Sequence, residues 1–341
     1  MYDAELDFAR TLVTEACGLT RRVQEQVVAS GEALAKGDRS PVTMADLAVQ
    51  AVAALRIAEH FPGDGLIGEE DATPVEDSPT LAAKVLKLAR RSLPGLTLEE
   101  LADALDRGDH PGGAEGRHWV LDPVDGTKGF LRGDQYAIAL ALVDHGEVVV
   151  GVLGCPNLPR PGERGVGEGF LFHAARGHGA WAAPTAGGDA VRIHVDGIDD
   201  PARAVVCESV EAAHAAHSVQ AGIAARLGVR AEPYRMDSQC KYAVLARGEA
   251  SIYLRLPRDE AYREKVWDHA AGAVVITEAG GRVSDLDGAA LDFSRGRRLA
   301  TGRGIVASNG LLHDRVLQAS RRHSGNLQIK PGAAPFHSIR T

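Results

Sequence analysis

The sequence predicts an α/β (α+β) protein, with a mainly antiparallel N-terminal sheet, accompanying helices and a smaller α/β C-terminal domain. Between residues 136 and 195, apolar runs are joined by short glycine-containing turns, which is typical of antiparallel strands. From about residue 203, apolar runs alternate with segments of helical spacing. We place the domain boundary at this change. The predicted parts are an N-terminal domain over 1–200, a C-terminal domain over 201–322, and a tail over 323–341 that we expect to be poorly ordered.

Composition narrows the class of protein. The 341 residues suffice for two domains, and 45% hydrophobic with 25% charged residues is the balance of a globular protein in water. The net charge of −8 argues against a nucleic-acid binder, whose surface would be basic. The N-terminal residues do not have the pattern of a secretory signal, and no apolar run reaches membrane-spanning length. The four cysteines are scattered, which is typical of reduced thiols. We therefore expect a cytoplasmic protein without nucleic-acid or membrane partners, either a monomer or a homodimer.

Helices dominate the first hundred residues. Apolar residues recur at three- and four-residue spacing, and capping residues mark two helix starts. The predicted elements are a helix over 3–34, a helix with Thr43 as N-cap and Asp46 in its first turn, a strand at 66–67, and two helical pieces within 80–107, the second capped by Thr97 and Glu100.

Strands follow, and then the alternating half. The run Trp119–Leu121 is a predicted strand that Pro123 should end, because proline lacks an N–H for the ladder. The other predicted strands are 136–143, 148–153, 169–174, 180–183, 191–195, 204–207, 251–256 and 305–307, with an exposed loop at 156–169 and helices at 211–227, 239–247 and 267–279.

The most informative stretch is Asp122-Pro123-Val124-Asp125-Gly126-Thr127. In a loop after a strand, two carboxylates and the carbonyl of Val124 can converge on one point, which is the oxygen coordination that Mg²⁺ and Mn²⁺ prefer. Gly126 lets the backbone approach a ligand, and Thr127 adds a hydroxyl and an amide. The alternative is an ordinary Asp/Pro/Gly turn with solvated carboxylates.

Three further acids lie in suitable places. Glu69 follows the short strand, Asp46 lies near a predicted helix start, and Asp268 opens the predicted helix at 267. Each also has a simpler interpretation, since acids are favourable at helix N-termini and Glu69 could belong to a solvated loop.

Together these motifs resemble the inositol-monophosphatase superfamily, the Li⁺-sensitive, Mg²⁺-dependent phosphomonoesterases. The resemblance covers about residues 5–315 and is carried by Gly68-Glu69-Glu70, by Asp122–Thr127 and by Trp267-Asp268-His269-Ala270-Ala271-Gly272. It implies the layered αβαβα sugar-phosphatase fold. One departure is Val124, where many relatives carry isoleucine, although only its carbonyl is expected to be used.

Within the superfamily, the chain is similar to the 3′(2′),5′-bisphosphate nucleotidases. The likeness lies in the runs 36–46, 236–242, 253–257 and 264–268. It implies hydrolysis of the 3′-phosphate of adenosine 3′,5′-bisphosphate (PAP) to AMP and phosphate, with the sulfated parent PAPS as a second expected substrate. An inositol phosphatase is the alternative within the superfamily, and a catalytically silent metal-binding regulatory protein is the alternative from another class.

By this resemblance, the metal ligands would be Glu69, Asp122, the Val124 carbonyl, Asp125 and Asp268. They would hold two or three Mg²⁺ ions, for which Mn²⁺ could substitute, and Li⁺ would inhibit. A phosphate dianion repels nucleophiles, so charge neutralisation by such ions is what its hydrolysis requires.

The resemblance also implies roles in catalysis and phosphate binding. Thr127 and Asp46 would orient and deprotonate the attacking water, since a threonine hydroxyl is too weak a base without an acidic partner. The amides of Gly126 and Thr127 would hold the phosphate being cleaved, and Asp268 would also contact the substrate.

The nucleotide would be bound by residues of the C-terminal half. Lys241 and Arg255 are the candidates for the second phosphate, because ammonium and guanidinium groups pair with phosphate oxygens. Ser238 could donate a hydrogen bond beside them. His217 matches the nucleotide-contacting histidine of the resembled enzymes, although His214 is an equally good candidate by sequence alone.

Overall fold

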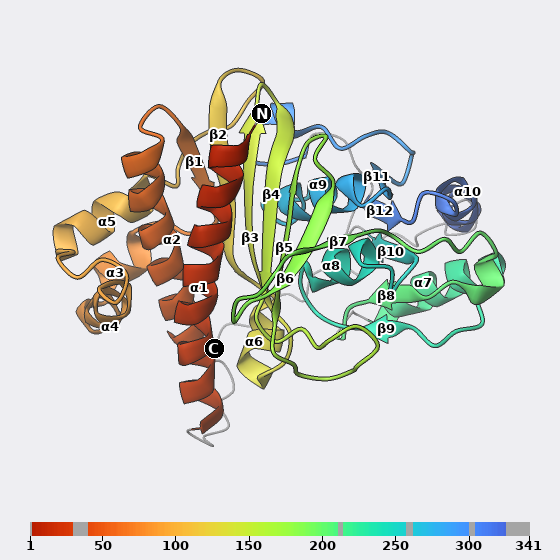
Figure 1. Ribbon diagram of the computed structural model, residues 1–341, viewed down its shortest axis with the longest axis horizontal. Coiled ribbons are helices and arrows are strands. Elements are labelled where there is room, and N and C mark those ends of the chain that lie inside the picture. Colours follow the sequence, from red (N-terminus) through yellow and green to blue (C-terminus); the bar gives the residue numbers. More distant parts are fainter. Residues whose placement is uncertain (1, 30–39, 211–213, 257–261, 300–303, 325–341) are drawn as a thin grey trace, which may run out of the picture.

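The computed structural model describes residues 2–29, 40–210, 214–256, 262–299 and 304–324 (Figure 1). Its helices are α1 (Asp3–Ala29), α2 (Ser40–His60), α3 (Thr73–Asp77), α4 (Pro79–Ala89), α5 (Leu98–Asp106), α6 (Thr127–Arg132), α7 (His214–Leu227), α8 (Cys240–Ala246), α9 (Ala270–Glu278) and α10 (His313–Ser324). Its strands are β1 (Gly65–Gly68), β2 (Arg117–Asp125), β3 (Ala137–Asp144), β4 (Glu147–Cys155), β5 (Phe170–Ala175), β6 (Ala180–Pro184), β7 (Val191–Ile193), β8 (Val206–Glu208), β9 (Tyr234–Arg235), β10 (Ile252–Arg255), β11 (Arg282–Asp285) and β12 (Ile305–Ser308).

These elements form five layers, as Figure 1 shows from left to right. Helices α1 and α2 cover one face of a seven-stranded sheet with the order β1 to β7, in which every neighbouring pair except β1–β2 is antiparallel. Helices α8 and α9 lie between that sheet and a five-stranded sheet of order β11-β12-β10-β8-β9. Helices α7 and α10 form the outer layer. The predicted αβαβα architecture and the mainly antiparallel first sheet are confirmed.

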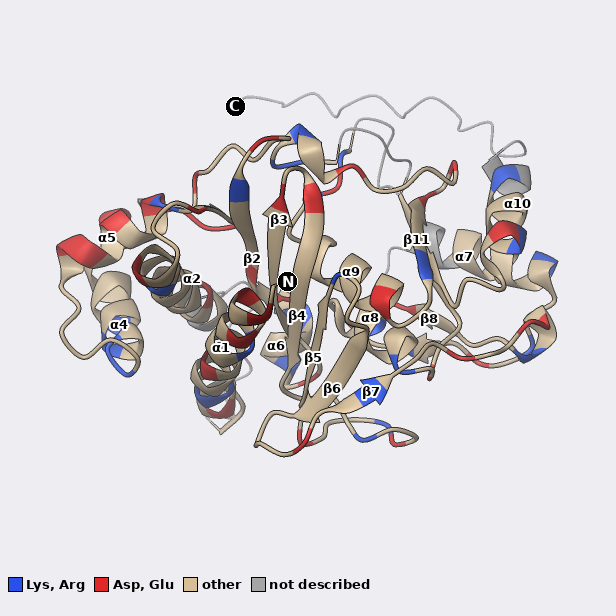
Figure 2. Ribbon diagram, turned by 45° about the horizontal axis from the view of Figure 1, so that its top comes forward, with Lys and Arg blue, Asp and Glu red and all other residues tan. Residues whose placement is uncertain are grey.

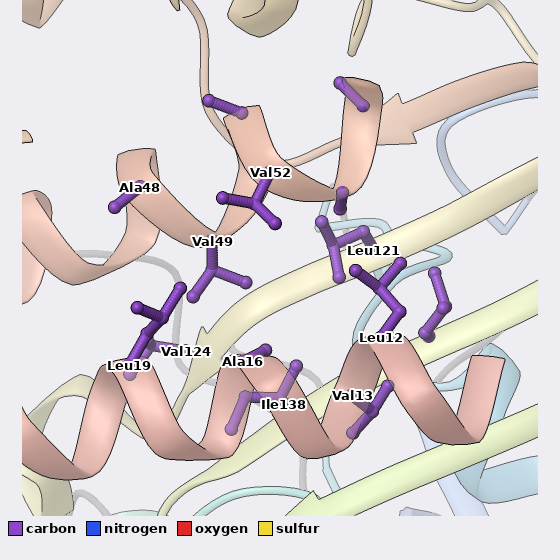
Figure 3. Close-up of a cluster of buried hydrophobic side chains, with 14 of the residues drawn as sticks. Leu12, Val13, Ala16, Leu19, Ala48, Val49, Val52, Leu121, Val124 and Ile138 are labelled. Atoms are coloured by element: carbon purple, nitrogen blue, oxygen red, sulfur yellow. The ribbon is translucent and has the colours of Figure 1, made fainter. Parts of the chain in front are cut away.

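Alternation along the strands explains how the first sheet packs. In β3, the large side chains of Ile138, Leu140 and Leu142 belong to the hydrophobic cluster under α1 and α2. Figure 3 shows Ile138 in that cluster together with Val124 of β2. The intervening residues of β3 are mostly alanines and face the cluster that includes α8 and α9. Small residues on this face let α9 lie close to the sheet. A Cβ on Gly151 of β4 would stand only 2.3 Å from the Val274 side chain.

Charged residues lie on the helices, in the loops and at strand ends, whereas β5 and β6 carry no Lys, Arg, Asp or Glu (Figure 2). Within the described residues, no helix is both long and apolar enough to cross a membrane. All four cysteines are buried and form no disulfide. Helix α9 follows β10 in the sequence but packs on the first sheet, so the domain boundary near residue 200 stays a prediction. Most of the predicted tail lies outside the described residues.

Three of the element boundaries that differ from expectation lie at predicted site residues. Helix α2 begins at Ser40, so Thr43 is inside the helix and Asp46 lies in its second turn; Pro41 in the first turn favours this earlier start. Strand β2 continues through Pro123 to Asp125, and a register irregularity between Asp122 and Asp125 accommodates the proline. Helix α9 begins at Ala270, which leaves Asp268 in the preceding turn.

Of the other predicted elements, one helix cap is confirmed, one loop is only partly exposed, and several short elements were not predicted. The capping box of Thr97 and Glu100 is present in both directions and starts α5. The loop at 156–169 is buried over its first four residues and exposed mainly from Arg160 onward. Sequence analysis missed the short elements α3, α6, β9 and β11 and the helix α10. The predicted helix over 3–34 is described as far as Ala29, and the rest of it lies outside the described residues.

Candidate metal centre and active site

The pairing of β1 with β2 brings the first two acidic motifs together. These strands are parallel, with Gly68 opposite Leu121. Glu69 and Asp122 each follow that pair by one residue, so both carboxylates leave the same edge of the sheet. This is the one parallel pair in the first sheet as described, and it places the first two acidic side chains of the site next to each other.

The turn that carries Glu69 is fixed from two sides. Gln50 of α2 donates from Nε2 to the Glu70 carbonyl (2.6 Å) and accepts from the Glu70 amide through Oε1 (2.9 Å). A Cβ on Gly68 would stand 2.4 Å from the end of that Gln50 side chain, so a larger residue there would displace the Gln50 amide from Glu70. Arg297 donates to the Gly68 carbonyl (2.6 Å) and lies over the Trp267 ring, 5.1 Å from its centroid.

The turn after β2 is held by the segment that precedes α8. Gly126 has φ of +93°, and Ser238 has the unusual φ of +66° for a residue with a side chain. This backbone conformation places the Gln239 amide against the carboxylate of Asp125, with 2.6 Å between N and Oδ2. Thr127 then begins α6. The left-handed glycine and the charge-assisted hydrogen bond together define where Asp125 lies.

Three carboxylates meet at this edge. One oxygen from each of Asp122, Asp125 and Asp268 lies within 4.8 Å of the others. Asp122 Oδ1 is buried and has no hydrogen-bond partner within the described residues. A buried, unpaired carboxylate oxygen surrounded by like charges is unfavourable unless a cation is bound. The donor set consists of hard oxygens, so these residues fit a divalent ion such as Mg²⁺.

The electrostatics of the acids support this interpretation. Burial and the nearby charge of Asp268 raise the pKa of Glu69 to about 7. Burial and Asp268 raise the pKa of Asp125 to about 6. For Asp122, burial and the charge of Glu69 hold the pKa well above its ordinary value. These carboxyls therefore retain protons more readily than ordinary acids, and a bound cation would release those protons.

The predicted catalytic pair comes from two helices that contact each other. Asp46 lies on α2 and Thr127 on α6. Asp46 is 7% exposed, and burial together with the charges of Glu70 and Glu69 raises its pKa well above the ordinary value. In the described structure, the side chains of Asp46 and Thr127 form no hydrogen bond to each other.

Both predicted phosphate-binding cations lie beside the carboxylates. Lys241 is buried on α8, where its ammonium donates to the Met236 carbonyl (3.3 Å). Burial lowers the pKa of Lys241, while the Asp125 carboxylate opposes this shift. Arg255, at the end of β10, donates from Nη2 to Asp268 Oδ2 (2.8 Å) and from Nε to Glu264 (2.9 Å).

A buried chain of polar groups supports Arg255. Glu264 also lies 3.3 Å from Nε2 of His269, whose Nδ1 lies 2.8 Å from the Tyr242 hydroxyl. His269 and Glu264 are almost completely buried. The grouping of Glu264, Asp268 and His269 therefore belongs to an ion-pair network with Arg255, and we assign no metal to it.

The remaining nucleotide candidates differ in what the structure describes. Ser238 packs against Gly126, and its hydroxyl accepts from the Cys240 amide (3.2 Å). His217 and His214 belong to α7, but their side chains lie outside the described part of the structure. The choice between these two histidines stays open.

Sequence reasoning assigned no role to several residues that shape this site. They are Gln50, Gln239, Glu264, His269 and Arg297. Gln239, Glu264 and His269 stand within or beside the quoted motifs, so their position offered a signal. Gln50 and Arg297 lie outside the three acidic motifs, and only the fold brings them to the first of these.

The close approach of Gly126 to Ser238 yields a testable expectation. Gly126→Ala should lower the free energy of unfolding by about 2–4 kcal/mol, because alanine is strained at positive φ and its Cβ would stand 2.8 Å from the Ser238 Cβ. Urea denaturation measures this loss. Gly18→Ala in α1 is the control, with nothing within 4 Å of the new Cβ, and should be neutral or stabilising. Equal effects of the two substitutions would contradict the predicted strain.

Fold and site together define a layered α/β protein with a buried carboxylate cluster at the carboxyl ends of two parallel strands, suited to binding divalent cations. The sequence matches the inositol monophosphatase family over residues 2–324. The chain belongs to that family, as its motifs predicted.

Individual relatives agree with this assignment. A 3′(2′),5′-bisphosphate nucleotidase of Oryza sativa is 44% identical over 337 residues, covering 93% of this chain and 94% of the relative. The corresponding enzyme of Emericella nidulans is 40% identical, covering 94% of this chain and 98% of its own. Among solved structures, SuhB of Mycobacterium tuberculosis has a TM-score of 0.60 at 22% identity, covering 94% of this chain and 97% of its own. An inositol monophosphatase from Zymomonas mobilis has a TM-score of 0.63 at 19% identity, with 94% and 99% covered. The structural matches support the fold.

Proposed function

We propose that this protein is a Mg²⁺-dependent phosphomonoesterase that hydrolyses the 3′-phosphate of PAP to AMP and phosphate, and that also accepts PAPS. The observation that carries the proposal is the meeting of Asp122, Asp125 and Asp268 within 4.8 Å, with Lys241 and Arg255 beside them. A carboxylate cluster flanked by cations suits a substrate with two phosphates. The names of the relatives favour a nucleotide as the carrier of those phosphates.

The proposed metal ligands are Glu69, Asp122, the Val124 carbonyl, Asp125 and Asp268. When bound, the ions would neutralise the phosphate charge and lower the pKa of a coordinated water. The side chain of Val124 is buried in the core beneath α1 and α2, which anchors the backbone between the two aspartates. Mn²⁺ should substitute for Mg²⁺, and Li⁺ should inhibit.

The chain's own groups would handle the water and the phosphate. Thr127 would hold the attacking water, and Asp46 would accept its proton, a role that a buried carboxyl with a raised pKa suits better than an ordinary acid. The amides of Gly126 and Thr127 would bind the oxygens of the phosphate being cleaved. The hydrogen bond from the backbone amide of Gln239 to the Asp125 carboxylate would keep the turn at Gly126 and Thr127 in place.

The second phosphate of the nucleotide would pair with Lys241 and Arg255. Both are held by protein contacts before substrate arrives, which reduces the entropy lost on binding. Ser238 and His217 are the further proposed contacts to the nucleotide.

Lys241→Met should raise KM for PAP by about 10–100-fold, because one charge-assisted hydrogen bond contributes about 1.5–3 kcal/mol. The KM for adenosine 3′-monophosphate, which lacks the second phosphate, should rise much less. Steady-state kinetics on both substrates measures the difference. Lys84→Met, at an exposed position on α4, is the matched control and should leave both values unchanged. An equal rise for both substrates would remove Lys241 from the second-phosphate site.

A side-by-side substrate panel tests the proposed specificity. Phosphate release from PAP, PAPS, inositol 1-phosphate and inositol 1,4-bisphosphate is measured at equal concentration with saturating Mg²⁺. PAP should give the highest kcat/KM. A clear preference for an inositol phosphate would overturn the nucleotide assignment and favour the alternative within the family.

A further inference from the structure

We infer that Gln239 is a positioning residue that fixes the distance between the carboxylates of Asp125 and Asp268, and thereby sets the affinity of the centre for divalent ions. This inference rests on the proposed function, because it takes both aspartates to be metal ligands. Gln239 is 2% exposed and lies between the two motifs, at the start of α8.

Gln239 contacts both motifs through different groups. Its backbone amide donates to Asp125 Oδ2 at 2.6 Å. Its side-chain Nε2 donates to the Trp267 carbonyl at 2.9 Å, one residue before Asp268. Its Oε1 accepts from the Gly272 amide at 3.2 Å, in the first turn of α9. A single residue therefore bonds to Asp125 at the end of β2 and to both sides of the turn that carries Asp268.

The chemistry of these contacts demands an amide. One end of the side chain meets a carbonyl and the other meets an N–H, so a neutral group with a donor and an acceptor satisfies both. The first-turn amides of a helix lack partners within the helix, and His269 at the N-cap of α9 supplies no side-chain cap. The side chain of Gln239, at the start of α8, accepts a hydrogen bond from one of these amides, that of Gly272.

The surroundings leave little freedom to compensate. Ser238 adopts φ of +66°, a conformation that costs energy and is retained where the surrounding structure enforces it. On the other side, a Cβ on Gly272 would stand 2.4 Å from the Tyr242 ring, so the start of α9 is packed against α8. The start of α9 is thus fixed by packing, whereas the turn before it, which carries Asp268, is held by the Gln239 side chain through the Trp267 carbonyl. Loss of that bond would let this turn shift while Asp125 stays on its backbone hydrogen bond.

Calorimetric titration of Mg²⁺ and of Mn²⁺ into the metal-free protein tests this role. Gln239→Met keeps the length of the side chain and removes both of its hydrogen bonds, and it should weaken ion binding about 10–100-fold, the range for partners that orient metal ligands. Gln239→Asn keeps the amide but is one methylene too short to reach both partners. It should fold even if the methionine variant does not, and should weaken binding by a smaller factor.

Asn309→Leu is the matched control. Asn309 is a buried amide that also accepts from a backbone amide beside a helix start, that of Leu312 just before α10, and donates to Asp196 and Ile198, none of which belongs to the carboxylate cluster. This variant should lose thermal stability and bind ions as the wild type does. The inference is overturned if the Gln239 variants bind like the wild type, or if Asn309→Leu weakens binding equally. Wild-type protein that bound neither ion would instead overturn the proposed function, and the inference with it.

Discussion

Replacing Asp122 by asparagine should lower kcat for PAP by more than 100-fold and at the same time stabilise the metal-free protein. The catalytic loss follows because even residues that merely orient metal ligands contribute about 10–100-fold. The gain in stability follows because burial and the charge of Glu69 raise the pKa of Asp122, so the metal-free protein must either bury a charge or take up a proton when it folds. Asparagine avoids both costs at nearly constant volume. Activity assays and urea denaturation in the presence of chelator measure the two effects.

Asp285→Asn provides the opposite case. Asp285 is also buried, but its carboxylate accepts from the amides of Asp287 and Ala289 in a turn after β11, and no acid of the cluster contacts it. Its replacement should lower stability and leave kcat unchanged. If Asp122→Asn destabilised the metal-free protein as Asp285→Asn does, Asp122 would be a structural carboxylate and the charge argument would fail.

Mg²⁺ should raise the melting temperature more at pH 8 than at pH 5. The folded-state pKa of Glu69, about 7, and that of Asp125, about 6, exceed the values of unfolded acids. The folded metal-free protein therefore binds these protons more tightly than the unfolded chain. This contribution to stability is complete below about pH 4 and is lost as the pH rises through 6 and 7. Mg²⁺ competes with those protons, so it stabilises most where they have dissociated.

Buried histidines give stability the opposite pH dependence to that of the carboxyls. The quantity to measure is therefore the change in melting temperature that Mg²⁺ causes at each pH. Burial lowers the pKa values of His118, His173 and His313 to about 4. Their contribution is present above pH 6.5 and is lost as the pH falls toward 4. They lie outside the carboxylate cluster, so their effect should cancel between samples with Mg²⁺ and with chelator. A melting-temperature increase that is independent of pH, or larger at pH 5, would contradict the assigned pKa shifts.

Much of the fold could be predicted from local patterns. The hairpin of β3 and β4 and the capping box at Thr97 depend on neighbouring residues, which the sequence displays directly. Helix and strand boundaries were less predictable where the same residue type is compatible with two local structures. Pro123 can end a strand or lie in a bulge, and the pairing partner of β2 decides between them. Short elements such as β9 owe their conformation to the strand beside them.

In the site, too, the residues within motifs could be predicted from the sequence, whereas the contacts made by the fold could not. Its acids could be named because each follows a recognisable motif, and the parallel pairing of β1 with β2 explains why Glu69 and Asp122 adjoin. The contacts of Gln239 and Arg297 join segments far apart in the chain, so no local pattern indicates them. The ion pair of Arg255 with Asp268 likewise links a predicted phosphate-binding residue to a predicted metal ligand, which neither motif reveals alone.

The most direct test of the carboxylate cluster as the catalytic centre is the release of AMP and phosphate from PAP by the purified protein, followed with added Mg²⁺, with chelator, and with Mg²⁺ plus Li⁺. We predict equal amounts of AMP and phosphate with Mg²⁺, no turnover with chelator, recovery when Mg²⁺ is restored, and inhibition by Li⁺. Turnover that continued undiminished in chelator would contradict the assignment of Asp122, Asp125 and Asp268 as a metal-dependent site.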